Sequence, residues 1–468
     1  MVSTYSVEVQ NSGRQYLPAS GDAAATRSPN QFLLPVTAQV NEQDHLEVGG
    51  CDVTNLVQQF GSPLYIVDEE TLRTTCRQYR EAFKQYYPGE SQVLYASKAW
   101  SCLAICAIAA SEGLGIDVVS GGELYTALQA GVSPDKLYFH GNNKSVAELE
   151  FAVESGCNIV VDNWLELQTL AGMPAKETPI RILLRLTPGI ECHTHEYIRT
   201  GHLDSKFGFD PNQLDEVFTF VSQQPTLNCA GLHAHIGSQI FELQPHQDLA
   251  GVMVQWLSKA AGYGLSIEEL NIGGGLGIRY TESDDPPSID DWVKVIGEAI
   301  AAACQAQNIA LPKLLSEPGR SLVGPTCITA YTMGSQKTVP DIRTYVTVDG
   351  GMSDNPRPIT YQSVYRAVVA NKMSAAMSET VAIAGKHCES GDILIKEAHL
   401  PQTEPGDTLV VMGTGAYNYS MASNYNRLPR PAAVLVRAGE ANLILQRETY
   451  QDLIRQDRLP ERLGGLTA

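Results

Sequence analysis

Residues 115–161 read GIDVVSGGELYTALQAGVSPDKLYFHGNNKSVAELEFAVESGCNIVV. Three short apolar runs alternate in this stretch with two longer segments of helical spacing; the runs are 115–119, 137–140 and 158–161, and the helical segments are 120–130 and 145–155. Short apolar runs are typical of strands that are buried on both faces, and strands that alternate with helices lie parallel in one sheet. This stretch therefore predicts consecutive βαβ units.

The same alternation continues on both sides of this stretch. Five further runs predict strands and three further segments predict helices; the strands are Gln92–Ala96, Arg181–Leu186, Asn228–His235, Glu269–Ile272 and Lys313–Ser316, and the helices are Asp210–Gln224, His246–Gly262 and Ile289–Gln307. Eight parallel strands separated by helices can close into a barrel, which typically has roughly 250 residues. We therefore predict an α/β fold with a (β/α)8 TIM barrel at residues 63–323; an open doubly wound sheet is the alternative.

A different pattern flanks the predicted barrel. After Val323, short apolar runs separated by turns predict strands at Thr344–Val348, Val381–Ala384, Thr408–Val411, Ala433–Val436 and Leu443–Gln446. We expect a C-terminal, mainly β domain, similar to a sandwich or barrel, formed by residues 324–468 together with 32–62. Phe32–Val36 and Leu46–Val48 are possible strands of the latter segment. Residues 1–31 are polar, and we predict a disordered extension.

The composition excludes several classes of function. The chain has 33 Lys and Arg residues against 52 Asp and Glu residues, a formal net charge of −19, and no cluster of basic residues. Such an acidic protein repels nucleic acids and anionic lipids, and no apolar run approaches the roughly 20 residues that span a bilayer. The N-terminus lacks the pattern of a secretory signal, and the ten cysteines form no Cys-x-x-Cys pair. We expect a cytoplasmic protein that binds neither nucleic acid nor membranes.

Polar residues and a run of glycines gather where the predicted barrel strands end. These residues are Lys98, His140, Arg185, His233, His235, Ser238, Gly273, Gly274, Gly275, Glu317 and Arg320. The carboxyl ends of barrel strands meet at one rim, and active sites of barrel enzymes lie there. Basic side chains concentrated at this rim are unfavourable unless an anion balances them, so we predict an active site that binds an anion.

The turn after the seventh strand, Gly273-Gly274-Gly275-Leu276-Gly277, predicts a phosphate site. Glycines let backbone N–H groups approach a phosphate closely, and barrels often bind phosphate at the loops after strands seven and eight. Arg320, after the eighth strand, can add a charged donor. A plain tight turn is the alternative. A Rossmann nucleotide site is disfavoured because these glycines do not open a nucleotide-binding βαβ unit.

Lys98 and Glu317 indicate what kind of ligand binds. A lysine at the end of an inner strand is partly desolvated, so we expect a lowered pKa and an amine that can form a Schiff base. A lysine that simply reaches into solvent is the alternative. Glu317 lies across the same rim and can pair with a protonated pyridine nitrogen, which makes the ring an electron sink. An amine, a phosphate site and an acidic ring partner together predict pyridoxal 5′-phosphate.

Several motifs carry a resemblance to a known family: Tyr95-Ala96-Ser97-Lys98-Ala99, His235-Ile236-Gly237-Ser238-Gln239, Gly273-Gly274-Gly275 and Glu317-Pro318-Gly319-Arg320. Through them the chain resembles the barrel-type pyridoxal-phosphate decarboxylases related to alanine racemase. Within that group it is similar to the diaminopimelate decarboxylases. The finer match rests on Thr200-Gly201, Asp204-Ser205-Lys206-Phe207-Gly208, Asp349-Gly350-Gly351-Met352, Arg357-Pro358, Cys388-Glu389-Ser390-Gly391-Asp392 and Gly415-Ala416-Tyr417. The resemblance implies decarboxylation of meso-2,6-diaminopimelate to L-lysine and CO2, the last step of lysine biosynthesis.

The resemblance also implies a role for each matched residue. Lys98 would hold the cofactor as a Schiff base, His235 would stack on its ring, and Glu317 would face the ring nitrogen. The phosphate would be bound by Ser238, Gly273, Gly274, Gly275 and Arg320, and the substrate by Arg320, Arg357, Tyr361, Glu389 and Tyr417, with Tyr417 also near the cofactor. Cys388 would donate the proton that replaces the lost carboxylate. In this family the site lies at a homodimer interface, and the partner chain supplies Cys388 and Glu389.

Rival enzymes fit these residues less well. Arg357 offers a planar fork that suits a second carboxylate and Glu389 an anion for a second ammonium, whereas a pocket for ornithine would need only the anion. A racemase would have a tyrosine base where this chain has Cys388, and a Schiff-base aldolase would have no use for Glu317. A catalytically silent homologue would lack Lys98 or Cys388, and both are present.

Other polar residues receive no part in the predicted site. Cys192-His193-Thr194-His195 and His202 could be read as metal ligands, but their spacing fits no standard zinc site, so we predict no metal. Asp117 and Asp162, at strand ends, are interpreted as helix caps or as groups that orient their neighbours.

Overall fold

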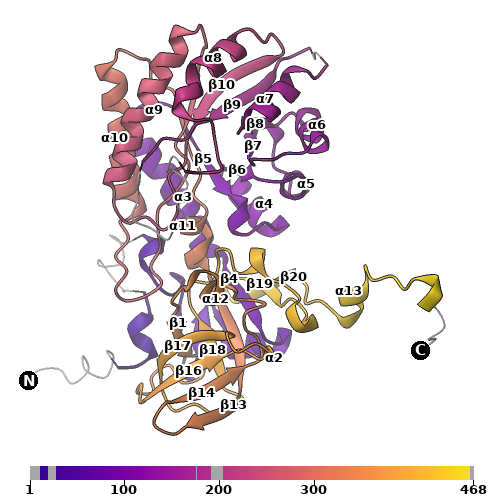
Figure 1. The fold of residues 1–468 in the computed structure, drawn as a ribbon. Helices are drawn as coiled ribbons and strands as arrows, with labels where there is room; N and C mark the ends of the chain where they lie inside the picture. The colour runs from indigo at the N-terminus through magenta and orange to yellow at the C-terminus, as the bar shows by residue number, and fades with distance from the viewer. Residues whose placement is uncertain (1–10, 19–27, 175–176, 191–203, 464–468) are drawn as a thin grey trace, which may run out of the picture.

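The computed structural model describes residues 11–18, 28–174, 177–190 and 204–463, which form two domains (Figure 1). In the first, the described residues form a closed barrel of parallel strands that follow one another in sequence order, with the last strand pairing back to the first. The strands are β5 (Ser91–Ala96), β6 (Gly115–Val118), β7 (Leu137–Phe139), β8 (Asn158–Val161), β9 (Ile180–Arg185), β10 (Leu227–His233), β11 (Glu269–Asn271) and β12 (Lys313–Ser316). The predicted eight-stranded barrel is confirmed, and the open sheet is excluded.

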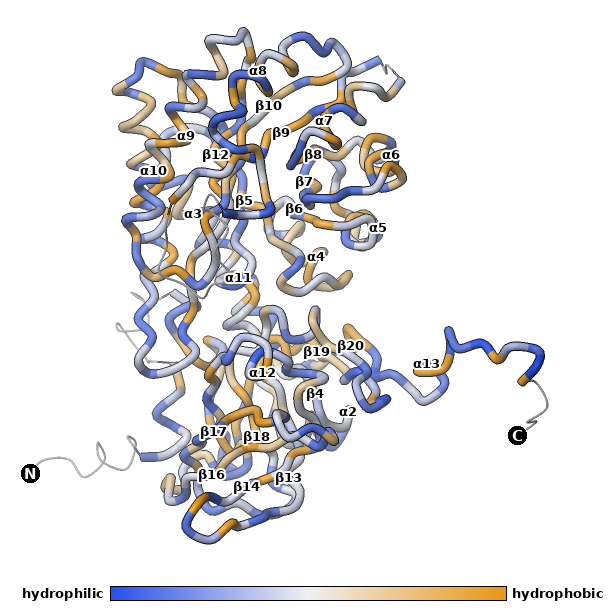
Figure 2. The backbone as a smooth tube through the Cα atoms, in the orientation of Figure 1, coloured by the Kyte–Doolittle hydropathy of each residue, from blue (hydrophilic) through white to orange (hydrophobic). Residues whose placement is uncertain are grey.

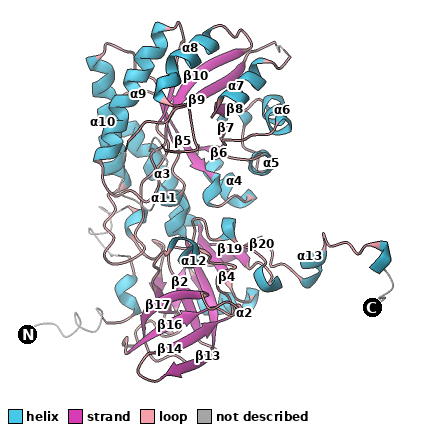
Figure 3. Cartoon of the chain, in the orientation of Figure 1, coloured by secondary structure: helices cyan, strands magenta, loops and turns pink. Residues whose placement is uncertain are grey.

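Helices surround the barrel strands, as Figure 3 shows. They are α3 (Glu69–Tyr86), α4 (Leu103–Ser111), α5 (Gly121–Gln129), α6 (Val146–Ser155), α7 (Trp164–Ala171), α8 (Leu214–Ser222), α9 (Gln244–Gly262), α10 (Ile289–Ala306) and, after the last strand, α11 (Arg320–Val323). Side-chain caps set several of the starts. Ser145 accepts a hydrogen bond from the N–H of Glu148, whose carboxylate accepts from the N–H of Ser145, a capping box that begins α6 where the sequence predicts a helix.

The interior of the barrel is filled by side chains. Five of the strands each contribute one buried side chain to an interior cluster: Leu94, Tyr138, Val160, Leu183 and Leu315. This cluster is separate from the larger one that packs between the strands and the helices. In Figure 2 the barrel strands carry orange, hydrophobic segments interrupted by blue, hydrophilic ones. Because side chains fill the interior of such a barrel, a binding site of this domain is expected at an end of the barrel.

The second domain is mainly β, as predicted. The order along its large sheet is β17-β16-β14-β13-β4-β19-β20, and β18 pairs with both β13 and β15. The strands are β4 (Leu64–Asp68), β13 (Cys327–Val339), β14 (Arg343–Val348), β15 (Ala367–Val369), β16 (Glu379–Ala384), β17 (Ile393–Leu400), β18 (Thr408–Val411), β19 (Ala432–Arg437) and β20 (Glu440–Leu445). A small separate sheet contains β1 (Gln39–Val40), β2 (Leu46–Val48) and β3 (Cys51–Asp52), and the domain's helices are α2 (Val53–Phe60), α12 (Arg357–Tyr361) and α13 (Tyr450–Ile454).

Two details of the predicted boundaries are wrong. β4 lies between β13 and β19 in the second domain, although the prediction places its residues at the start of the barrel. All five of its residues are buried, so its apolar sequence resembles that of a barrel strand. Phe32–Val36 is not a strand, because the preceding turn of 3-10 helix, Pro29–Gln31, leads into irregular backbone. Leu46–Val48 is a strand, as expected.

Parts of the expected N-terminal extension are held by the two domains. The Asn11 carbonyl accepts a hydrogen bond from the N–H of Met377 (2.8 Å), and Tyr16 donates to Glu282 (2.8 Å). Ser28 Oγ accepts from the N–H of Ile289 (2.9 Å). Residues 11–18 and 28–31 therefore differ from the predicted disordered extension, because tertiary contacts supply an order that their polar sequence does not indicate. Among the described residues, no helix is long and apolar enough to cross a bilayer.

Candidate active site

A cavity of about 420 Å³ lies at the carboxyl end of the barrel strands, where the two domains meet. Its lining includes Lys98, His235, Ser238, Glu317 and Arg320 from the barrel, Arg357, Tyr361 and Tyr417 from the β domain, and also Val119, His140, Gly141, Asn142, Arg185, Phe207 and His233. A larger cavity of about 650 Å³, beside Asp52 in the β domain, has no Lys, Arg or His in its lining. The cavity at the barrel rim therefore combines the predicted amine, anion and cations.

Lys98 follows β5 in a short 3-10 turn, Ser97–Ala99. Its side chain is 42% exposed, toward the cavity, and its Nζ lies 3.8 Å from Oδ2 of the buried Asp117. Burial by itself would lower the pKa of Lys98, but Asp117 first, and then Tyr417 and Glu317, raise it overall. The expected lowered pKa is therefore wrong. Asp117, interpreted above as a helix cap or as a group that orients its neighbours, lies beside Lys98, as the second interpretation holds.

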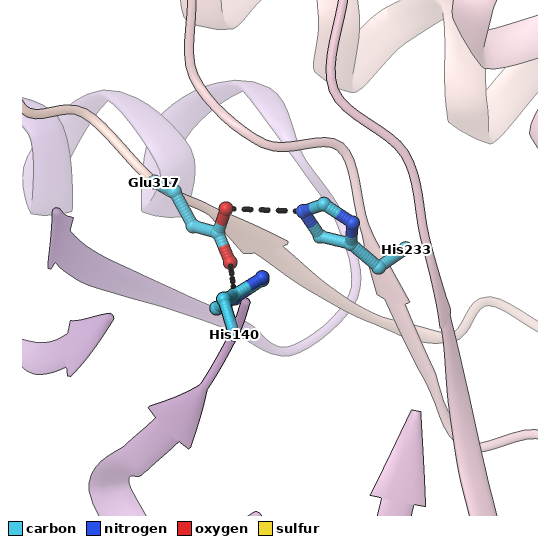
Figure 4. Close-up of side chains that lie close together, drawn as sticks. All are labelled: His140, His233 and Glu317. Carbon is cyan, nitrogen blue, oxygen red and sulfur yellow. Dashed lines mark hydrogen bonds and ion pairs between the residues drawn. The ribbon is translucent and has the colours of Figure 1, made fainter. Parts of the chain in front are cut away.

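Glu317 is the buried carboxylate of the cavity, and two imidazoles hold it (Figure 4). His140 Nε2 lies 2.8 Å from Oε1 and His233 Nε2 lies 3.1 Å from Oε2. Asn271 Nδ2 also donates a hydrogen bond to Oε1 (2.6 Å). Burial would raise the pKa of Glu317, but His140 and His233 outweigh it and hold the pKa well below its usual range. The carboxylate is therefore negatively charged at neutral pH.

His140, His233 and Glu317 could also be taken for metal ligands, since their ligand atoms lie within 4.8 Å of one another. In Figure 4 a dashed line joins each imidazole to a different oxygen of Glu317. His233 Nε2 makes a hydrogen bond with Oε2, whereas the 2.8 Å contact of His140 Nε2 with Oε1 is an ion pair without hydrogen-bond geometry. The absence of a metal from this site stays a prediction. The alternative metal-ligand stretch, with Cys192, His193, His195 and His202, lies outside the described residues.

Arg320 forms the cationic end of the cavity. Its side chain is buried at the start of α11, donates from Nε to Ser238 Oγ (3.0 Å) and from Nη1 to the hydroxyl of Tyr280 (2.8 Å). The guanidinium also lies 4.9 Å from the ring centre of Tyr417. A buried guanidinium with a hydroxyl beside it is a suitable binding site for a phosphate.

The glycine turn supports the barrel rim more directly than the cavity. The N–H of Gly273 donates to Asn271 Oδ1 (2.9 Å), and the N–H of Gly274 donates to His235 Nδ1 (3.2 Å). A Cβ on Gly274 would lie 2.4 Å from the carbonyl oxygen of Glu317. The first two glycines thus permit close packing of the turns after β11 and β12, as the tight-turn alternative holds, and contact of Gly273, Gly274 and Gly275 with a phosphate stays a prediction.

The β domain contributes an arginine and two tyrosines. Arg357 is buried, donates from Nε to the hydroxyl of Tyr365 (2.9 Å), and lies 5.3 Å from the ring centre of Tyr361 and 5.7 Å from that of Tyr417. The backbone N–H of Tyr417 donates to the carbonyl of Ala99 (2.8 Å), next to Lys98. This contact places the predicted substrate-binding side chains of one domain over the predicted Schiff-base lysine of the other.

Cys388 and Glu389 are not in the cavity of their own chain. Both lie in the loop between β16 and β17 and are exposed, and the backbone N–H of Cys388 donates to Asn426 Oδ1 (2.8 Å). Among the nine cysteines that the structure describes, Cys388 alone is exposed. Their expected roles in the site of a partner chain stay predictions.

Sequence reasoning missed several residues of the site. It places His140 and His233 at strand ends without a role, and it leaves out Asp117, Asn271 and Tyr280. All five lie near the carboxyl end of a barrel strand or in the loop that follows one. This position is a signal by which sequence reasoning could have included them in the site. What the sequence could not show is the pairing across the rim, because Glu317 meets histidines 177 and 84 residues away in the chain.

Comparisons with known proteins agree with this geometry. Residues 69–324 match the family described as "Pyridoxal-dependent decarboxylase, pyridoxal binding domain", and residues 299–415 match "Pyridoxal-dependent decarboxylase, C-terminal sheet domain". The chain belongs to the pyridoxal-dependent decarboxylases. It is 65% identical to the diaminopimelate decarboxylase of Synechocystis sp. over 96% of this chain and 98% of that one, and 48% identical to that of Bacillus subtilis over 92% and 99%.

Solved structures give the same result for the fold. The crystal structure of a diaminopimelate decarboxylase from M. jannaschii in complex with L-lysine is similar with a TM-score of 0.85 and 33% identity, covering 91% of this chain and 99% of that one. A lysine/ornithine decarboxylase from Vibrio vulnificus, 21% identical with a TM-score of 0.70 over 86% of this chain and 100% of that one, shares the fold.

The cofactor of this family is pyridoxal phosphate, and the donor set of the cavity fits it. Lys98 offers an amine for the aldehyde, the charged Glu317 offers an acceptor for a protonated ring nitrogen, and Arg320 with Ser238 offers cationic and hydroxyl donors for the phosphate.

Proposed function

We propose that this pyridoxal-dependent decarboxylase converts meso-2,6-diaminopimelate to L-lysine and CO2, the last step of lysine biosynthesis. The observation that carries the proposal is the single cavity in which Lys98, Glu317 and Arg320 meet Arg357. The names and high identities of the relatives, and the lysine complex of a structural neighbour, support the same substrate.

When bound, pyridoxal phosphate supplies a ring that accepts the electron pair left when a carboxylate departs as CO2. Lys98 supplies the amine that links covalently to the aldehyde, and His235 supports the ring face. Glu317, kept anionic by its histidines, holds the proton on the ring nitrogen. Arg320 and Ser238 hold the phosphate. Gly273, Gly274 and Gly275 are proposed as further backbone donors, for which the N–H groups of Gly273 and Gly274 have to exchange their present hydrogen bonds to Asn271 and His235.

The substrate carries a second amino-acid group at its far end, and the proposal assigns residues to both of its charges. Arg357 donates from Nε to Tyr365 and from Nη2 to Ser363, and the remaining N–H groups of its fork are assigned to a carboxylate. The rings of Tyr361 and Tyr417 lie beside that guanidinium, and Arg320 also lies near the ring of Tyr417. Glu389 provides the anion for the distal ammonium. This arrangement favours a diamino dicarboxylate over ornithine.

The proton donor comes from a second copy of the chain in this proposal. Cys388 and Glu389 are exposed and absent from the cavity lining of their own chain, so a homodimer that carries them into the partner's cavity completes the site. The nine described cysteines are all unpaired, which supports our expectation of a reducing, cytoplasmic location.

A CO2-release assay tests the function. Purified protein with added pyridoxal phosphate is compared on meso-diaminopimelate, ornithine and arginine at equal concentrations. We expect release from meso-diaminopimelate and at least about a hundredfold lower kcat/KM for the other two. Ornithine and arginine lack the second carboxylate, and leaving the Arg357 guanidinium without it costs about 3 kcal/mol of binding free energy. Comparable release from ornithine would contradict the assigned substrate, and conversion without CO2 would favour a racemase or an aldolase.

A further inference from the structure

Glu317 is the last member of a row of titratable groups, of which Asp117, His140 and Glu317 itself are buried. His140 Nε2, which lies 2.8 Å from Glu317 Oε1, is also 3.8 Å from Oδ1 of Asp117, so one ring nitrogen contacts two carboxylates. The other oxygen of Asp117 lies 3.8 Å from Lys98 Nζ. The row therefore runs from the amine of Lys98 through Asp117 and His140 to Glu317.

The ionised form of Asp117 depends on neighbouring cations. It is buried, and neither carboxylate oxygen has a hydrogen-bond partner among the described residues. A buried carboxylate without hydrogen bonds is strongly unfavourable unless cations balance it. Burial raises the pKa of Asp117, while His140, Lys98 and the more distant Arg185 act against that rise and Glu317 adds to it. The charge on Asp117 is therefore sensitive to both of its contacts.

The two histidines around Glu317 differ in their contacts with Asp117. Burial lowers the pKa of His233 to about 4, so at neutral pH its ring is neutral and donates from Nε2 to Glu317 Oε2. Its ring packs edge-on against that of His140, with the centres 4.7 Å apart. Within the described part of the chain, no ion pair joins His233 to Asp117. His233 thus contacts one carboxylate and His140 contacts two.

We propose that His140 is a positioning residue that bridges Asp117 and Glu317, so that a change of charge at Lys98 is transmitted to the carboxylate at the ring-nitrogen end of the cavity. This inference rests on the proposed function, which assigns Lys98 and Glu317 to the cofactor. A ring nitrogen directs its one hydrogen to one acceptor at a time, so Asp117 and Glu317 compete for the Nε2 hydrogen of His140. An ammonium on Lys98 stabilises the carboxylate of Asp117, which then competes less strongly with Glu317 for that hydrogen. Besides the members of the row, the titratable and charged groups that face it are Glu123, Tyr138, Arg185, His233, His235 and Tyr417.

The pH dependence of the cofactor's visible absorbance in the holoenzyme tests this bridge. His140→Gln keeps a neutral donor for Glu317 but removes the imidazole that contacts Asp117, so that Lys98 is the remaining ion-pair partner of Asp117 among the described residues. The absorbance midpoint, which reports the charge at the Lys98 nitrogen, should therefore rise by about one pH unit or more. The matched control, His233→Gln, likewise keeps a neutral donor for Glu317, but among the described residues His233 has no ion pair to Asp117 to lose, so this variant should move the midpoint by less than half as much.

A double variant separates the bridge from a general effect of losing an imidazole. If the coupling passes through Asp117, then His140→Gln should produce no further rise in an Asp117→Asn background. Equal shifts in the two single Gln variants would overturn the proposal, as would a His140→Gln shift that persists without Asp117. Should Asp117→Asn fail to fold, the comparison of the two Gln variants still decides. A wild-type protein without any visible cofactor absorbance would refute the proposed function as well.

Discussion

At Lys98, burial and charge act in opposite directions. A desolvated lysine loses its proton more easily, and this is what its strand-end position predicts. Asp117, 3.8 Å away, reverses the direction and raises the pKa. Protein with an unlinked Lys98 therefore carries an ammonium at neutral pH, and the proton must leave before the amine can attack an aldehyde. Asp117 is the carboxylate closest to that proton.

Replacement of Lys98 by alanine tests the covalent link. Lys98→Ala removes the amine, so we expect no protein-linked visible absorbance after incubation with pyridoxal phosphate and no borohydride labelling of the peptide that contains residue 98, with activity falling to background. Lys294→Ala, on the exposed face of α10, is the control and should keep both signals. An unchanged spectrum in Lys98→Ala would contradict the assignment.

Arg357→Lys tests the assigned carboxylate site. The guanidinium donates from Nε to Tyr365 and from Nη2 to Ser363 (3.3 Å), whereas a lysine has a single nitrogen to share between these hydroxyls and a substrate. We expect KM for diaminopimelate to rise about ten- to a hundredfold, equivalent to losing one charge-assisted bidentate contact. The dissociation constant of pyridoxal phosphate, measured by fluorescence, should stay within about threefold. A defect explained entirely by cofactor loss would mean that Arg357 has another role.

The sequence identifies single residues better than their partners. Lys98, Glu317 and Arg320 could be placed at one rim because each follows a strand whose apolar pattern is clear, and strand ends share one rim. His140 could be placed at the same rim, yet its contacts with Asp117 and Glu317 depend on the tilt of three strands and on side-chain rotamers. Neither quantity is encoded in a local pattern, so the charge relations of the site required the structure.

At the level of elements, the turn after β11 shows how glycine content can serve packing. A Cβ on Gly274 would approach the Glu317 carbonyl oxygen to 2.4 Å, and backbone there cannot give way as a flexible side chain would. The same contact joins the turns that follow β11 and β12, since the N–H of Glu317 donates to the Gly273 carbonyl (2.7 Å). Movement of this turn would shift Glu317 itself.

Gly274→Ala is therefore expected to reduce both stability and cofactor affinity. Forcing two backbones apart costs about 1–3 kcal/mol, which lowers the melting temperature by several degrees and weakens pyridoxal phosphate binding through Glu317. Gly251→Ala is the matched control, because a Cβ there meets nothing within 4 Å and the residue lies inside α9. Thermal unfolding and equilibrium binding measure the two effects. A Gly274→Ala protein as stable as Gly251→Ala would show that the turn has room to adjust.

The predicted elements agree best with the structure where the pattern repeats. All eight barrel strands are predicted to within a few residues, because each apolar run is followed by a helical segment. The assignment of β4 to the barrel is wrong, since five buried residues in a row fit either sheet. Ile66 of β4 pairs with Ile328 of β13 and with Val434 of β19, which lie 262 and 368 residues further along the chain. A strand with such distant partners carries no local signal of its domain, because the assembled sheet sets its register and neighbours.

For the whole molecule, the division of the site between two domains matters most. The barrel supplies the proposed cofactor residues, and the β domain places Arg357, Tyr361 and Tyr417 over them. The loop that carries Cys388 is exposed elsewhere on the same β domain. One chain therefore holds everything proposed for cofactor binding but lacks the proposed proton donor in its own cavity. Pairing of two copies would supply each cavity with the other chain's thiol.

Subunit complementation tests this arrangement. Lys98→Ala and Cys388→Ala are each expected to be inactive alone, but a dimer with one chain of each kind has one cavity with both defects and one with none. Random re-pairing of an equal mixture should therefore restore about a quarter of wild-type activity, as half of the dimers are mixed and each has one intact site. The matched control mixes Lys98→Ala with Glu317→Gln, whose defects both lie in their own chain's cavity, so that every site stays defective and no recovery is expected. Recovery in the control, or none in the first mixture after proven exchange of subunits, would show that Cys388 does not act across the interface.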